Sequence, residues 1–193
     1  MNIIELVIDE NEELFGIEAI SVVENPAIEE DFIALKNQDQ IRLAEVSKEK
    51  RILMGAALIP DKPIYRKSDD HEFYIFFSKD TVAKASQMYL KAGNQGQATM
   101  EHATEKLEGM TVVESWIIED EVHDKSRKYG LDMPVGTWMI SIKCTNDEVW
   151  AKVKENKIRG FSIEGYFADR LSNRPLDKQV DQLTEEDKLL NEI

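Results

Sequence analysis

The sequence holds few of the residues that build disulfides, metal sites and membrane spans. It contains one cysteine, Cys144, and three histidines among 193 residues. A single cysteine cannot form an internal disulfide, which is typical of proteins from a reducing compartment. Because the histidines and the cysteine show no metal-ligand spacing, we expect no metal and no cofactor. No apolar run approaches the roughly 20 residues that a membrane span needs.

Positive charge is also scarce. The chain has 24 lysines and arginines against 38 acidic residues, a formal net charge of −14. Such a surface repels phosphate backbones and anionic lipids, so no nucleic-acid or membrane partner is expected. Residues 1–16 lack the basic segment that precedes the apolar stretch of a signal peptide. These features favour a soluble cytoplasmic protein.

Hydrophobic residues make up 42% of the chain, enough for the core of one domain with a tail. Strands are expected at 3–9, 16–23, 51–60, 72–78, 111–120, 137–144 and 158–168, and helices at 79–93, at 145–157 and in a short segment from Pro26. This order lacks the regular alternation of a doubly wound sheet. It predicts an α+β fold, a mostly antiparallel, curved or closed β-barrel surrounded by helices.

The expected strand over 158–168 contains one conspicuous polar residue, Ser162. Alternation of side chains places Ser162 and Glu164 on one face, opposite Phe161 and Ile163. Such a serine is either an ordinary polar strand residue or a nucleophile. A serine nucleophile needs a general base, because its hydroxyl is barely ionised at neutral pH.

Histidine is the usual base, since it titrates near neutral pH. His102 follows the apolar Met100 and precedes an expected strand, so it is either a structural histidine or the base. His71 and His123 lie in charged segments and are expected to be solvated.

A catalytic triad also requires a carboxylate that orients the imidazole. Glu114 lies in the expected strand 111–120, where alternation groups it with the apolar Val112 and Trp116. A carboxylate enters such a setting only when a partner compensates it, which is either an arginine or a catalytic histidine. Glu164 is the alternative third member. It lies only two residues from Ser162 on the same strand, so the two side chains point in nearly the same direction and cannot easily flank an imidazole. We therefore prefer Glu114.

Other catalytic motifs are missing from the sequence. The glycine-containing turn 93–97 lacks the Lys-Ser/Thr of a phosphate loop. In Gly-Phe-Ser-Ile-Glu-Gly, two residues separate Ser162 from the second glycine, so the segment is not a GxSxG elbow. This spacing argues against an α/β-hydrolase.

A histidine before a strand, in 100–120, is followed by a strand–helix–strand unit that ends in Gly-Phe-Ser-Ile-Glu-Gly-Tyr-Phe at 160–167. This combination resembles the prohead (head maturation) serine proteases of tailed bacteriophages, in the phage serine protease branch. Segments 20–35 and 55–66 are similar to the same branch, so the resemblance covers roughly residues 15–170.

The resemblance implies the fold of the herpesvirus assemblins, a β-barrel wrapped by helices. It makes Ser162 the nucleophile and His102 the general base of an acyl transfer, with Glu114 as our choice of third member. The oxyanion intermediate needs hydrogen-bond donors, for which Arg159 and the amide of Gly160 are candidates.

The implied function is a serine endopeptidase that acts inside the phage procapsid, in the host cytoplasm. It would cleave the scaffold protein, extensions of the major capsid protein, or both, and self-cleavage and a homodimer are further expectations. Residues 1–170 would form the protease domain. Residues 171–193 would form a mobile, acidic and polar tail, either a scaffold-like segment or a solubilising one.

Two alternatives remain open at the level of sequence. The chain could be an inactive protease-fold component of the capsid interior, structural or scaffolding in role. It could also be a non-viral binding module in which 160–167 is simply an edge strand.

Overall fold

The computed structural model describes residues 2–8, 16–28, 32–35, 50–68, 71–120 and 122–171. The strands are β1 (Asn2–Val7), β2 (Gly16–Val23), β3 (Ile33–Leu35), β4 (Ile52–Leu58), β5 (Ile64–Ser68), β6 (His71–Phe76), β7 (Ala98–Met100), β8 (Met110–Ile117), β9 (Trp138–Cys144), β10 (Gly160–Tyr166) and β11 (Ala168–Leu171). The helices are α1 (Lys79–Lys91), α2 (Lys125–Lys128) and α3 (Asp147–Lys154), with a 3-10 turn, η1 (Asn94–Gly96), after α1. None of the helices in these ranges is long and apolar enough to cross a membrane.

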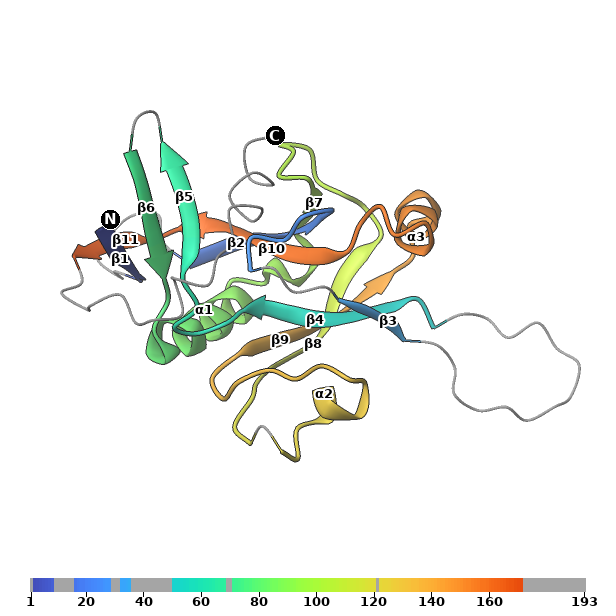
Figure 1. Cartoon of the computed structure of the whole chain (residues 1–193). Helices are drawn as coiled ribbons and strands as arrows, with labels where there is room; N and C mark the ends of the chain where they lie inside the picture. The colour runs from blue at the N-terminus through green and yellow to red at the C-terminus, as the bar shows by residue number, and fades with distance from the viewer. Residues whose placement is uncertain are drawn as a thin grey trace, which may run out of the picture.

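The described strands pair into three open sheets (Figure 1). Their strand orders are β11-β1-β6-β5, β10-β2-β7 and β3-β4-β9-β8. Only the β1–β6 and β2–β7 pairs are parallel among the described ladders. Each of the seven strands expected from the sequence overlaps an observed strand, whereas the short β3, β7 and β11 and the hairpin strand β5 were not expected. The closed, herpesvirus assemblin-like barrel stays a prediction.

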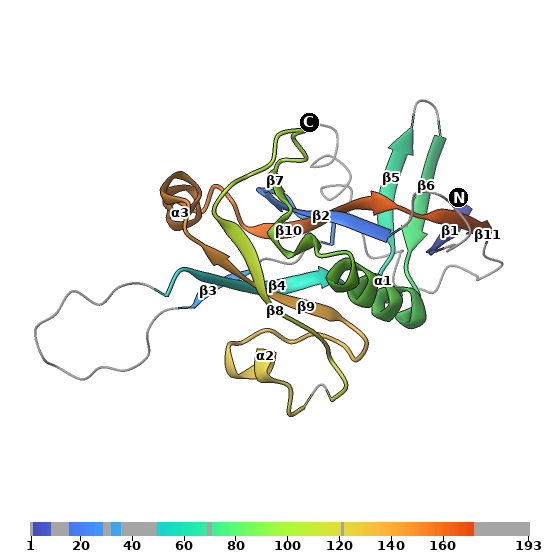
Figure 2. The same ribbon diagram turned by 180° about the vertical axis from the view of Figure 1, so that it is seen from behind.

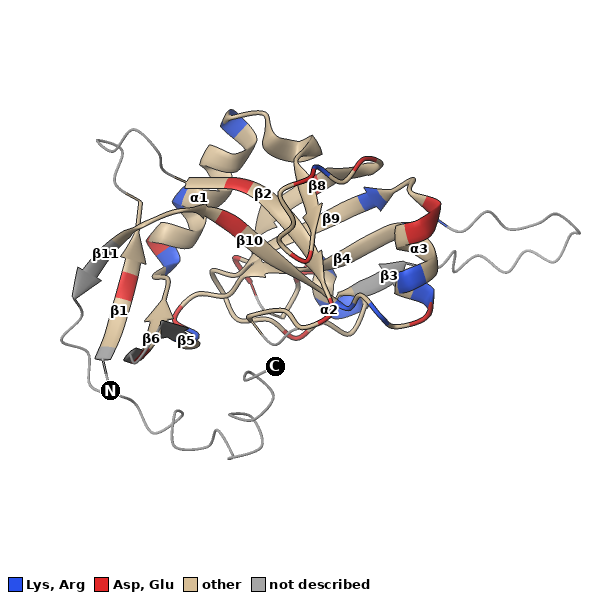
Figure 3. Ribbon diagram, turned by 90° about the horizontal axis from the view of Figure 1, so that it is seen from above, with Lys and Arg blue, Asp and Glu red and all other residues tan. Residues whose placement is uncertain are grey.

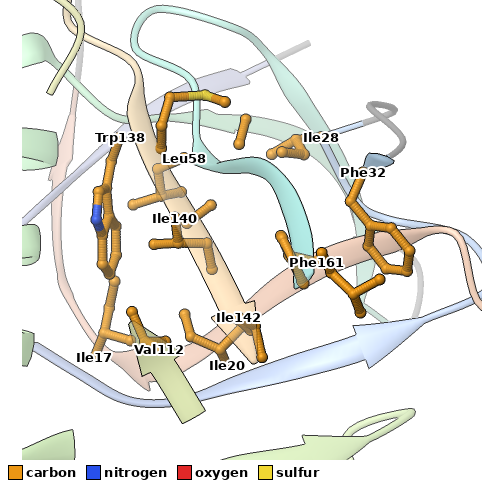
Figure 4. Close-up of a cluster of buried hydrophobic side chains, with 14 of the residues drawn as sticks. Ile17, Ile20, Ile28, Phe32, Leu58, Val112, Trp138, Ile140, Ile142 and Phe161 are labelled. Atoms are coloured by element: carbon orange, nitrogen blue, oxygen red, sulfur yellow. The ribbon is translucent and has the colours of Figure 1, made fainter. Parts of the chain in front are cut away.

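A cluster of apolar side chains lies between the second and third sheets. Figure 4 shows Ile20 of β2, Phe161 of β10, Leu58 of β4 and Ile140 of β9 in this one cluster. The largest fully buried side chains are Trp138, Tyr89, Phe161, Ile20, Leu53, Met54, Leu58, Met110, Ile118, Met139, Ile140 and Ile142. Burial of each contributes about 1.5–3 kcal/mol. This packing holds one face of β10 and β2 in the core and leaves the other face for polar residues.

Helix α1 confirms the predicted helix over 79–93. Ser78 is its N-cap, and Gly93 follows its end with a φ of +77°, a left-handed conformation that suits glycine. Val82, Ala85 and Tyr89 form its buried stripe. The Tyr89 ring meets Trp138 edge-on, with ring centroids 5.5 Å apart, which attaches the helix to β9.

The prediction of a short helix from Pro26 is wrong for the C-terminal part of that segment. Residues 27–28 form a turn, and Ile33–Leu35 is strand β3, paired antiparallel with β4. Phe32, just before β3, is buried against Phe161 with ring centroids 4.9 Å apart. Pairing with β4 and burial of Phe32 therefore override the local helical pattern.

Strand β11 ends at Leu171, which pairs with Ile4 of β1. The predicted acidic tail, 171–193, lies outside the described residues beyond that point.

Figure 3 shows acidic and basic residues along the described elements, with both signs on α3 and acidic positions on β1, β2 and β10.

Gly165 allows β10 and β2 to approach closely where their register shifts, between Glu164 and Gly165. A Cβ at Gly165 would lie 2.1 Å from the backbone oxygen of Gly16 and 2.8 Å from the Cα of Ile17. We expect Gly165→Ala to lower the free energy of unfolding by about 3 kcal/mol, because two backbones must separate. Urea unfolding followed by tryptophan fluorescence measures this loss.

Gly96→Ala is the matched control, because an added Cβ there meets no atom within 4 Å. Its effect should stay within about 0.5 kcal/mol. Equal unfolding midpoints for the two variants would contradict the close approach at Gly165.

Candidate active site

Three hydroxyl side chains form a row across the second sheet. Ser162 of β10 pairs directly with Ser21 of β2, and Ser21 pairs with Thr99 of β7. Directly paired residues project from the same face of a sheet. Ser21 and Thr99 are buried, whereas Ser162 is partly exposed. The serine predicted from the sequence therefore sits at one end of a hydroxyl row, which we call the Ser162–Ser21–Thr99 row.

Glu164 extends its carboxylate toward this row. It lies two residues after Ser162 on the same strand and face, and it pairs with the small Ala19 of β2. Thr99 donates a hydrogen bond from Oγ1 to Glu164 Oε1. The Glu164 side chain thus spans β2 and reaches β7, which the two-residue separation from Ser162 did not suggest.

His102 lies in a tight turn directly after β7. Glu101 and His102 have φ angles of +50° and +55°, so two consecutive residues are left-handed. This conformation costs about 1–2 kcal/mol for each residue. Two hydrogen bonds to β2 hold the turn: Glu101 N donates to Val22 O at 3.2 Å, and His102 N donates to Ser21 Oγ at 3.0 Å. Strain of this kind, fixed by its surroundings, is common at functional sites.

The imidazole of His102 turns toward Glu164. Its Nδ1 lies 3.3 Å from Glu164 Oε1, the oxygen that also accepts from Thr99. The His102 side chain is 48% exposed and that of Glu164 is 29% exposed. A carboxylate at Nδ1 favours the tautomer with the proton on Nδ1, which leaves Nε2 as a proton acceptor.

The structure brings together Ser162, His102 and Glu164 on one face of the second sheet. The hydrogen bond that a base makes to its nucleophile is not formed between these described residues. In the described part of the chain, the side-chain partners of His102 in hydrogen bonds and ion pairs are Ser21 and Glu164, and no hydrogen bond joins its ring to the Ser162 hydroxyl. Catalytic hydrogen bonds between a base and its nucleophile often tighten only in the complex with substrate.

Glu114 occupies a different part of the molecule. Its Oε1 lies 2.9 Å from Lys125 Nζ, and its Oε2 accepts a hydrogen bond from Ser141 Oγ at 2.6 Å. Lys125 also lies 3.7 Å from the centre of the Trp116 ring. In Figures 1 and 2, α2, which begins at Lys125, lies below β8 and β9, whereas β10 and β2 lie above β4. Glu114 therefore attaches α2 to the third sheet, and the structure does not bring it to His102.

A bulge in β8 explains why Glu114 was expected in an apolar setting. Val112 pairs with Ile142 of β9, but Glu114 pairs with Ser141, so Val113 is an extra residue. The bulge reverses the alternation, and Val112 and Glu114 no longer share a face. The interpretation of Glu114 as buried among apolar residues is wrong, because its side chain is 48% exposed.

The two proposed oxyanion donors lie just before Ser162. Arg159 donates from Nε to the backbone oxygen of Glu24 at 3.1 Å and from its guanidinium to Asn25 Oδ1 at 2.8 Å. These bonds tie Arg159 to the turn after β2. Gly160 is buried and pairs with Val23. Assignment of Arg159 and Gly160 to an oxyanion hole stays a prediction.

The remaining reactive side chains have other environments. His123 Nδ1 lies 2.7 Å from Asp120 Oδ2, and this hydrogen bond, with two from backbone amides, lowers the pKa of Asp120 to about 2. Cys144 is buried, which raises the pKa of its thiol. Within the described ranges, no group of three or more histidine, cysteine or acidic residues could hold a metal.

Sequence reasoning missed Ser21 and Thr99. Ser21 is a hydroxyl residue in an apolar strand, the same local signal that singled out Ser162, whereas Thr99 lies in β7, a short strand that the sequence did not predict. That signal becomes informative only when the pairing partners of each strand are known.

The surroundings of Glu114 predict a pH dependence of stability. Hydrogen bonds from Lys125 and then Ser141 hold the pKa of Glu114 below its usual value. The resulting stabilisation is complete above the pKa of the unfolded state and is lost as pH falls through the lower pKa of the folded state. We expect Glu114→Gln to be less stable than wild type near pH 7.

This difference should disappear in acid and shrink in 1 M salt, because the pair is partly exposed. Urea unfolding of both proteins from pH 7 down to pH 3 measures it. A difference that is constant over that range would show that the ion pair contributes nothing.

Comparison with known families gives one matching model and one curated relative. The model of the family described as "Putative phage serine protease XkdF" matches residues 40–171, which is more than half of the chain and contains Ser162, His102 and Glu164. The chain is 26% identical over 167 residues to the phage-like element PBSX protein XkdF of Bacillus subtilis (strain 168).

That alignment covers 82% of this chain and 55% of the relative, so the chain spans about half the length of the protein it matches. No solved structure matches the chain. The family model and the relative confirm the resemblance inferred from the residues: the chain belongs to a family of phage serine proteases.

Proposed function

We propose that the chain is a serine endopeptidase in which Ser162 is the nucleophile, His102 the general base and Glu164 the residue that orients the base. The observation that carries this proposal is the 3.3 Å approach of Glu164 Oε1 to His102 Nδ1, on the sheet face that carries Ser162. Glu164 replaces Glu114 as third member, because the carboxylate of Glu114 is held by Lys125 and Ser141.

The arrangement supports acyl transfer. His102 Nε2 accepts the proton of the Ser162 hydroxyl as Oγ attacks the peptide carbonyl carbon. The tetrahedral intermediate collapses, the C–N bond breaks, and the imidazolium gives its proton to the leaving amine. A water molecule, deprotonated by His102, then hydrolyses the acyl-enzyme and regenerates Ser162. The Glu164 carboxylate stabilises the imidazolium in both halves of the reaction.

The proposed substrates are segments of the phage scaffold protein and of the major capsid protein, together with the enzyme itself, cleaved during procapsid maturation. Membership of a phage protease family supports this role. The net charge of −14 also supports it, because a protease inside a procapsid need not bind the DNA that enters later. The same proposal places the enzyme inside the procapsid in the host cytoplasm, and a homodimer is part of it.

One observation favours a second candidate. No hydrogen bond in the described part of the chain joins the His102 ring to Ser162, which would also suit an inactive, structural member of the family in the capsid interior. The cleavage experiment below separates the two.

Co-expression with the neighbouring scaffold and capsid proteins, followed by intact mass spectrometry, tests the proposed function. Wild type should give shortened products that Ser162→Ala and His102→Ala do not give, because loss of nucleophile or base costs about 10⁴-fold or more in rate. His123→Ala is the matched control, since His123 is exposed and contacts Asp120. Uncut proteins in every sample would favour the structural candidate.

The choice between the two carboxylates has its own test. Glu164→Gln should slow labelling of Ser162 by a fluorophosphonate about 10²- to 10⁴-fold, because the imidazole loses the group that fixes its tautomer. Glu114→Gln should label at the wild-type rate. The reverse pattern would return Glu114 to the site and remove Glu164 from it.

A further inference from the structure

Two of the three hydroxyls in the Ser162–Ser21–Thr99 row, those of Ser21 and Thr99, take no direct part in the proposed acyl transfer. We infer that Thr99 and Ser21 are positioning residues: Thr99 aims the Glu164 carboxylate at His102, and Ser21 holds the backbone of His102 in place. This inference rests on the proposed function, because it concerns the same site.

The case for Thr99 begins with a shared oxygen. Glu164 Oε1 accepts from Thr99 Oγ1 and faces His102 Nδ1, so one carboxylate oxygen lies between two donors. Glutamate has three side-chain torsions, and a partly exposed glutamate would otherwise sample many rotamers. The Thr99 side chain is buried in β7, so its donor is fixed by the sheet. Thr99 therefore selects the rotamer in which Glu164 reaches the imidazole.

The case for Ser21 concerns the backbone. Ser21 is fully buried, and its Oγ accepts the hydrogen bond of His102 N at 3.0 Å. His102 lies in a left-handed conformation, which is costly for a residue with a side chain unless its surroundings hold it. Ser21 also pairs with Ser162 across β2 and β10. Ser21 thus links the strand of the nucleophile, through the β2–β10 pairing, with the turn of the base, through its side chain.

The sheet gives this arrangement its geometry. Ser21 and Thr99 share a face because β2 and β7 are in register, and Glu164 can pass over β2 because its direct partner is the small Ala19. Both Thr99 and Ser21 are buried. Their loss should therefore slow the chemical step and leave substrate binding almost unchanged.

Thr99→Val and Thr99→Ser form the matched pair of variants. Valine keeps the shape of threonine and removes the hydroxyl, while serine keeps the hydroxyl. Labelling with a fluorescent fluorophosphonate separates the inactivation rate constant from the apparent binding constant. We expect Thr99→Val to lower the rate constant about 10- to 100-fold at constant binding, and Thr99→Ser to restore most of it. Ser21→Ala should lower the same rate constant.

A double-mutant cycle separates positioning from a general structural effect. If Thr99 acts through Glu164, Thr99→Val should cause no further loss in the Glu164→Gln background. Losses that multiply in the double variant would overturn the inference. Should Thr99→Val fail to fold, Thr99→Ala removes the same hydroxyl with a smaller side chain.

The tautomer of His102 gives a readout that does not need activity. Nitrogen-15 NMR of the imidazole, assigned with the His102→Ala variant, should show the proton on Nδ1 in wild type and Thr99→Ser. A mixture of tautomers is expected in Thr99→Val and Glu164→Gln. Identical tautomers in wild type and Thr99→Val would overturn the inference, whether or not Ser162 reacts with the fluorophosphonate.

The outcomes for the two levels of proposal are distinct. No labelling of wild type, or equal labelling of wild type and Ser162→Ala, would refute the proposed function. Wild-type labelling that Glu164→Gln slows and Thr99→Val does not would refute only the role of Thr99.

Discussion

The pairing of β2 with both β10 and β7 is the constraint on which the candidate site depends. Its register aligns Ser162, Ser21 and Thr99 across three strands. A slip of one residue would move each of them to the opposite face. The core prevents this slip, because Ile20 and Phe161, neighbours of Ser21 and Ser162 in the chain, are buried on the other face. Apolar packing on one face thus determines which polar groups meet on the other.

The same sheet supports a conformation that the chain would not adopt alone. Two successive left-handed residues, Glu101 and His102, are unfavourable in an isolated segment. Hydrogen bonds to Val22 and Ser21 hold them. The residues that stabilise the turn therefore also place the imidazole, so stability and geometry of the site are coupled through β2.

Local patterns in the sequence were sufficient to locate Ser162 and His102 as candidates, because each stands out against its immediate neighbours. They were not sufficient for the carboxylate. Glu114 was preferred from strict alternation along β8, and a bulge at Val113 breaks that alternation. Glu164 was placed second because it lies so near Ser162 in sequence, yet its long side chain reaches across β2 to Thr99.

The sequence by itself determined the seven main strands, helix α1 with its Ser78 cap, and membership of the phage serine protease family, since these rest on local periodicity and on short motifs. Only the tertiary structure decided which carboxylate meets His102 and which hydroxyls surround it. Those contacts join β10, β2 and β7, which lie far apart in the chain. Their meeting depends on strand register and bulges, which follow from packing of the whole core and not from any single segment.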